Sequence, residues 1–119
     1  MSGRPLKNRM FLCRLGYAAA GLAHAIRRER SVRTQIAAAI GVVVVLAIIR
    51  PPALWWALAA LACGGVLAAE LLNTALEILI DHLHPDIHPE IRAAKDVAAG
   101  AVLVASLAAV AVAATFVLR

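Results

Sequence analysis

Three carboxylates and one amide interrupt an apolar stretch between residues 70 and 81. Glu70, Asn73 and Glu77 are spaced by three and four residues, so on a helix they share one face. Asp81 extends that face by one more turn. A carboxylate in hydrocarbon is costly unless it is solvated, paired or bound to a metal. These acids therefore indicate a functional site, and the alternative is a polar seam that holds helices together.

Such a face could support phosphoryl transfer. Carboxylates suit Mg²⁺, which usually takes one or two of them and completes its coordination with substrate phosphates. A nearby lysine, here Lys95, can neutralise phosphate charge, and a further carboxylate can accept the proton of an attacking hydroxyl. The chain contains neither a GxxxxGK[ST] loop nor the glycine loop of soluble kinases. A carboxylate-lined pathway for protons or cations would use similar residues, so it is an alternative function for this face.

The composition places this chemistry in a membrane. Of the 119 residues, 63% are hydrophobic, and long runs carry no charge, which predicts one integral membrane domain. Most of the 12 Lys and Arg precede residue 34. They are Arg4, Lys7, Arg9, Arg14, Arg27, Arg28, Arg30 and Arg33. Because a membrane segment adjoins this block, we expect anionic lipid headgroups as its partner and no nucleic acid.

The pattern predicts an all-α fold with an amphipathic surface helix and three transmembrane helices. The surface helix is expected at about residues 5–30, and the membrane helices at 34–49, 53–80 and 97–118. Pro51 and Pro52 should end the first span. Pro85 and Pro89 indicate an irregular loop over residues 82–95.

The basic residues also predict the topology. The positive-inside rule puts the N-terminus and the second loop in the cytoplasm. Glu29, Glu70 and Lys95, from three separate segments, then lie at one face of the membrane. His82, His84 and His88 fit no standard zinc spacing, so we expect them to be solvated.

Two motifs carry a resemblance to a known family. ELLNTALEILID, residues 70–81, and HPEIRAAKDVAAGAVL, residues 88–103, together resemble the signature of the bacterial diacylglycerol kinase family, which includes undecaprenol kinases. GYAAAGL, residues 16–22, and ERSVR, residues 29–33, match its N-terminal pattern, and the resemblance covers about residues 14–115. It implies three transmembrane helices, a surface helix, ATP with Mg²⁺, and a homotrimer with sites between subunits.

The resemblance also implies roles for individual residues. Glu70 matches the proposed general base, and Glu29 and Glu77 match the acids that bind the metal. Asn73 matches an essential polar residue of the site. Independently of the resemblance, we expect Asp81 and Arg33 to support the site. The positions that match ATP contacts are Tyr17, Glu29, Glu77, Asp86, Ile87, His88, Lys95 and Asp96.

The identity of the lipid depends on finer features. Many diacylglycerol-specific members carry F-R-Q-E where this chain has residues 32–35, VRTQ, and the AKDVAAGAVL stretch is closer to the undecaprenol-kinase-like branch. We expect diacylglycerol, the founding activity of the family, with undecaprenol as the alternative. The resemblance places the protein in the bacterial cytoplasmic (inner) membrane. A membrane scaffold or channel subunit is the non-enzymatic alternative, and it predicts no ATP turnover.

Overall fold

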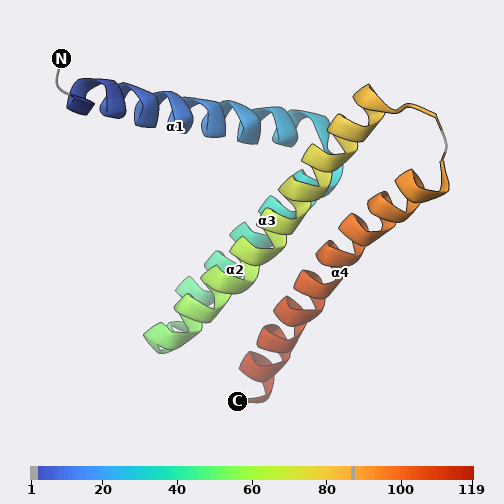
Figure 1. Ribbon diagram of the computed structural model, residues 1–119. Coiled ribbons are helices and arrows are strands. Elements are labelled where there is room, and N and C mark those ends of the chain that lie inside the picture. The colour runs from blue at the N-terminus through green and yellow to red at the C-terminus, as the bar shows by residue number, and fades with distance from the viewer. Residues whose placement is uncertain (1–2, 87) are drawn as a thin grey trace.

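The computed structural model describes residues 3–86 and 88–119, with side chains from residue 9 onward, and these residues form helices and no strands. The helices are α1 (Gly3–Arg28), α2 (Arg30–Ile49), α3 (Ala53–Leu83) and α4 (Pro89–Leu118). By length and composition, α2, α3 and α4 could each cross a membrane. The predicted all-α architecture with three spans is confirmed (Figure 1).

A single extended residue separates α1 from α2. Glu29 has φ −108° and ψ 119°, so the helical backbone stops at Arg28 and restarts at Arg30, earlier than the expected span at 34–49. The Arg33 side chain then turns back and its Nη1 donates to the carbonyls of Ile26 and Arg27, at 2.8 and 3.0 Å. These carbonyls belong to the last turn of α1, where the backbone C=O groups have no N–H partner within the helix. Arg33 thereby closes an elbow, residues 26–33, from which α1 leaves the other helices at a wide angle (Figure 1).

The turn between α2 and α3 follows the predicted proline stop. Arg50 adopts the left-handed conformation, with φ 54° and ψ 56°, and its N–H donates to the Leu46 carbonyl at 2.8 Å. Pro51 and Pro52 follow, and α3 begins at Ala53. The chain therefore reverses within a few residues, and α3 runs back alongside α2 (Figure 1).

The predicted loop over residues 82–95 is wrong in its length. Helix α3 continues to Leu83, and α4 begins at Pro89 rather than near 97. Proline is favourable at the first position of a helix, where its missing N–H has no helical partner to lose. His88 caps the new helix, because its Nδ1 accepts from the Glu90 N–H at 3.1 Å. Lys95 and Asp96 are therefore part of helix α4.

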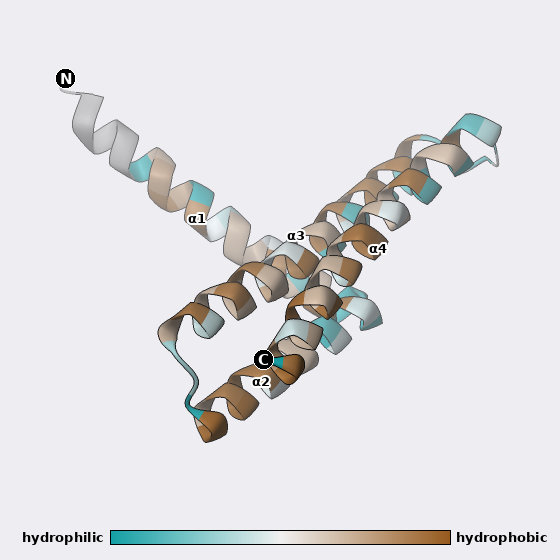
Figure 2. Ribbon diagram, turned by 90° about the horizontal axis from the view of Figure 1, so that it is seen from below, coloured by the Kyte–Doolittle hydropathy of each residue, from teal (hydrophilic) through white to brown (hydrophobic). Residues whose placement is uncertain are grey.

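The buried side chains concentrate where α3 meets α2 and the end of α1. They include Ala25, Val32, Val66, Glu70 and Thr74. The last three are spaced by four residues and share one face of α3. Helix α4 contacts α3 along its length but buries none of its own residues. Figure 2 shows that the exposed middle of these helices is hydrophobic, whereas the turn after α3 is hydrophilic.

Candidate functional site

The polar face of α3 runs from a buried end to an exposed end. Glu70 is 6% exposed, Asn73 and Glu77 are half-buried, and the Asp81 side chain is 54% exposed. Helix α3 is longer than α2, so the segment after Glu70 extends beyond the start of α2. This gradient matches the depth expected of a helix that leaves the membrane in this region.

Glu70 contacts a hydroxyl from a different helix. Ser31, in the first turn of α2, donates from Oγ to Glu70 Oε2 at 3.1 Å. A hydrogen bond to a buried polar group partly offsets the cost of removing that group from water. Sequence reasoning missed Ser31, because a single serine beside the elbow carries no spacing signal. It follows Glu29 by two residues within ERSVR, and that position was the only available hint.

Asn73 carries an unsatisfied acceptor. Its Nδ2 donates to Glu77 Oε1 at 3.4 Å, one helical turn away. Its Oδ1 is buried and, among the side chains that the structure describes, is the one buried polar atom without a hydrogen-bond partner. A buried acceptor left without a partner costs about 1–3 kcal/mol. This atom therefore marks a place where a bound donor or cation would be favourable.

Lys95 and Asp81 link α4 to the exposed end of this face. Lys95 Nζ donates to Asp81 Oδ1 at 2.6 Å, and the two side chains are 37% and 54% exposed. An ion pair this exposed contributes little to stability, because solvent screens it. The pairing places the ammonium group beside the acidic face of α3.

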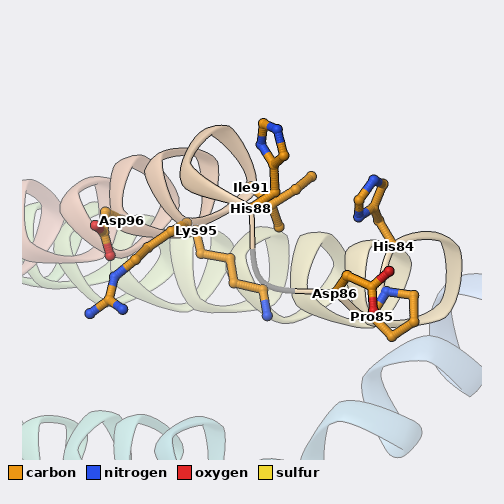
Figure 3. A pocket seen from close by; sticks show the side chains of 8 residues that line it. His84, Pro85, Asp86, His88, Ile91, Lys95 and Asp96 are labelled. Carbon is orange, nitrogen blue, oxygen red and sulfur yellow. The ribbon is translucent and has the colours of Figure 1, made fainter.

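An open pocket of about 310 Å³ adjoins this ion pair, between the turn after α3 and the start of α4 (Figure 3). Its lining includes Asp86, His88, Lys95 and Asp96, four of the residues predicted to contact ATP. Ile87, a fifth, lies outside the described residues. Figure 3 shows Lys95 and Asp96 emerging from the same part of α4, with Asp86 on the opposite side of the pocket.

Arg92 also lines the pocket, and sequence reasoning missed it. It precedes Lys95 by three residues, so the two cations share a face of α4. That spacing would have identified Arg92 if the helix had been expected to begin at Pro89. The pocket thus has two cations, which can pair with an anionic group such as phosphate, beside the carboxylates of Asp86 and Asp96.

Other predicted residues lie apart from this pocket. Glu29 is half-buried in the elbow, where its Oε1 lies 3.5 Å from Arg28 Nε. Tyr17 is 75% exposed on α1, and Arg33 bonds the end of that helix. Within the described residues, no three His, Cys, Asp or Glu side chains come together as a metal-binding group. A metal held by Glu29 and Glu77 would therefore need further oxygen ligands, which substrate phosphates supply in many Mg²⁺ sites.

The two ends of the polar face are well separated. Glu70 and Asp81 are about 16 Å apart along the axis of α3, by the rise of an α-helix. Glu70 and Asp81 of one chain are therefore too far apart for their carboxylates to contact the same atom of a substrate.

Comparison with known proteins identifies the family. Residues 16–117 match the family model for prokaryotic diacylglycerol kinase. The chain is 38% identical over 88 residues to an undecaprenol kinase of Bacillus subtilis, covering 74% of this chain and 72% of that protein. It is also 38% identical over 95 residues to a diacylglycerol kinase of Synechocystis, covering 79% of this chain and 54% of that protein.

These matches agree with the three apolar helices and with the polar face at their hydrophilic end. The family match includes α2 and α3 and nearly all of α4, so it spans the part of the chain that carries Glu70, Glu77 and Lys95. The chain belongs to the prokaryotic diacylglycerol kinase family and is a membrane lipid kinase.

Proposed function

We propose that the protein transfers the γ-phosphate of ATP to the hydroxyl of diacylglycerol, giving phosphatidic acid. A lipid kinase of this family uses a lipid, ATP and a divalent metal ion. The observation that carries the proposal is the environment of Glu70. This carboxylate is buried at the point where the apolar half of α3 becomes polar, and one of its oxygens is held by Ser31.

Glu70 is suited to act as the general base. A lipid hydroxyl sits just below the headgroup region, which is the depth expected for this part of α3. Glu70 accepts the hydroxyl proton while the lipid oxygen bonds to the γ-phosphorus, and the bond from that phosphorus to the β–γ bridging oxygen breaks to release ADP.

The metal that we propose is Mg²⁺, held by Glu29 and Glu77. The donor set fits, because both groups are half-buried carboxylates and Asn73 Oδ1, beside Glu77, is a buried acceptor without a partner. When bound, the ion neutralises phosphate charge in the transition state. The remaining ATP contacts are assigned to the pocket, through Asp86, His88, Lys95 and Asp96, and to Tyr17.

We also place the protein in the bacterial inner membrane as a homotrimer with a cytoplasmic N-terminus. The basic residues of α1 and the elbow support this orientation and favour contact with anionic lipid headgroups. Under this topology the elbow and the pocket both face the compartment that contains ATP.

Undecaprenol is the second candidate substrate. The undecaprenol kinase of Bacillus subtilis is 38% identical and is covered over 72% of its length, and the AKDVAAGAVL stretch favours the same branch. Both lipids present a primary hydroxyl, so the chemistry at Glu70 is the same for either.

Transfer of labelled γ-phosphate from ATP to the two lipids, side by side in detergent micelles, tests the proposal. We expect label in phosphatidic acid, and faster labelling of undecaprenol would reassign the substrate. Glu70→Gln should remove most turnover with little change in ATP affinity, because glutamine can still accept the Ser31 bond but cannot act as a base. Labelling of neither lipid by the wild-type protein, or normal turnover by Glu70→Gln, would reject the respective assignment.

A further inference from the structure

Among the described side chains, Ser31 has the one hydroxyl that donates a hydrogen bond to a side chain of another helix. Thr34 and Thr115 each donate to the carbonyl four residues earlier in their own helix, which is the usual arrangement for a helical hydroxyl. Ser31 Oγ instead donates across to Glu70 Oε2, which is 39 positions away in the chain. The Ser31 side chain therefore contacts the proposed base directly.

This bond distinguishes the two oxygens of the Glu70 carboxylate. Oε2 accepts from Ser31, whereas Oε1 has no hydrogen-bond partner among the described residues. Oε1 is also not fully enclosed, because Asn73 Oδ1 is the one buried side-chain polar atom without a partner in the described part of the chain. One oxygen is thus held and the other is left to accept a proton.

From this geometry we infer that Ser31 is a positioning residue for Glu70. It holds Oε2 so that Oε1 faces the lipid hydroxyl. The inference rests on the proposed function and adds a residue to it. Ser31 lies in the first turn of α2, directly after the elbow, so the orientation of the base depends on how α2 sits against α3.

A purely structural role for the same bond makes different predictions. If Ser31 only joined α2 to α3, its loss would lower thermal stability and leave the turnover of each folded molecule unchanged. Ser31 is exposed apart from this contact, and alanine is a favourable helix residue, so Ser31→Ala should fold. The variant can therefore separate the two roles.

The experiment compares Ser31→Ala, Ser31→Thr and Thr34→Ala in the full chain, measuring kcat, KM for ATP and the unfolding temperature in detergent. We expect Ser31→Ala to lower kcat roughly tenfold, as for loss of a hydrogen bond to a charged group, with KM for ATP unchanged. Ser31→Thr should recover most of the activity, because it restores the hydroxyl. Thr34→Ala removes a hydroxyl one turn further along α2, which bonds only within its own helix, and should match the wild type.

A double variant tests whether Ser31 acts through Glu70. Adding Ser31→Ala to Glu70→Gln should cause little further loss, because the base is already absent. A further tenfold loss in that background, or wild-type kcat in Ser31→Ala alone, would overturn the inference.

An infrared measurement tests the contact without any lipid. The carboxylate band of Glu70, identified by its absence in Glu70→Gln, should shift in Ser31→Ala and not in Thr34→Ala. If the wild type phosphorylates neither lipid, the proposed function fails, and this band still decides whether Ser31 holds Glu70. An unshifted band would reject the positioning role.

Discussion

The three acids of α3 differ in what they contact. Glu70 accepts from a hydroxyl of α2, Glu77 accepts from the Asn73 amide of its own helix, and Asp81 pairs with a lysine of α4. A base must keep an oxygen free for a proton, whereas a metal ligand must present its charge to a cation. The buried Glu70 fits the first role and the half-buried Glu77 fits the second.

Substitution of the proposed metal ligands should change the metal requirement. We expect Glu77→Gln and Glu29→Gln to raise the Mg²⁺ concentration that supports half-maximal activity by at least about tenfold, since each removes one anionic ligand. A titration of activity against Mg²⁺ measures this. Glu90→Gln is the matched control, because Glu90 is an exposed acid at the start of α4 outside the proposed ligands. Unchanged Mg²⁺ dependence in both ligand variants would reject the assignment.

At the scale of elements, the elbow determines where Glu29 lies. The break at Glu29 is closed by two bonds from Arg33 to the last carbonyls of α1. Both bonds come from one guanidinium nitrogen, Nη1, which carries two N–H donors. We propose that Arg33 supports the site indirectly, by holding the elbow that contains Glu29.

Loss of the Arg33 bonds should loosen the elbow. We expect Arg33→Gln to speed amide hydrogen exchange in residues 26–30 by roughly tenfold, with Arg33→Lys intermediate. Arg30→Gln is the control, because it removes a neighbouring positive charge but no side-chain hydrogen bond of the described structure. This variant should exchange at a rate near that of the wild type. Equal exchange in Arg33→Gln and Arg30→Gln would show that the two bonds do not hold the elbow.

The start of α4 is the second element that positions charge. Because the helix begins at Pro89, Arg92 and Lys95 are displayed on one face beside the turn after α3. A flexible loop at these positions would lose conformational entropy on ordering around phosphate. Because these residues are already helical, the backbone of Arg92 and Lys95 is ordered before phosphate binds.

At the scale of the whole molecule, one chain leaves much apolar surface without a protein partner. Helix α4 buries none of its residues, and an apolar cavity of about 460 Å³ opens between α2, α3 and α4, lined by Trp55, Cys63 and Phe116 among others. Trp55 packs edge-on against Phe116 at 5.2 Å between ring centroids. Lipid or further copies of the chain must cover this surface, and small residues on α4 favour close helix contacts.

The proposed homotrimer should assemble its sites from different chains. If Glu29 and Glu70 of one site come from different subunits, inactive Glu29→Gln and Glu70→Gln chains, unfolded and reassembled together, should regain part of the activity. Some mixed trimers would then contain one site with both native residues.

Two controls make the mixing experiment decisive. Each variant alone must still trimerise, and wild-type chains must recover activity under the same protocol. If these conditions hold and mixing restores nothing, Glu29 and Glu70 belong to the same chain's site.

The sequence by itself determined the architecture and the polar face. Hydrophobic runs identified three spans, and the spacing of Glu70, Asn73 and Glu77 put them on one side of α3, because both patterns are local properties of a helix. The roles of these residues remain predictions. The sequence pattern does not predict the helix start at Pro89, because proline interrupts a helix in its interior but is favourable at its first position.

Only the tertiary structure decided which side chains meet across helices. The contacts of Ser31 with Glu70 and of Lys95 with Asp81 depend on how far α3 and its neighbours slide past one another. No local spacing encodes that register, because it results from packing around Val32, Val66 and Thr74 and from the length of the turns. The partner of the proposed base was therefore visible only once α2 and α3 were placed side by side.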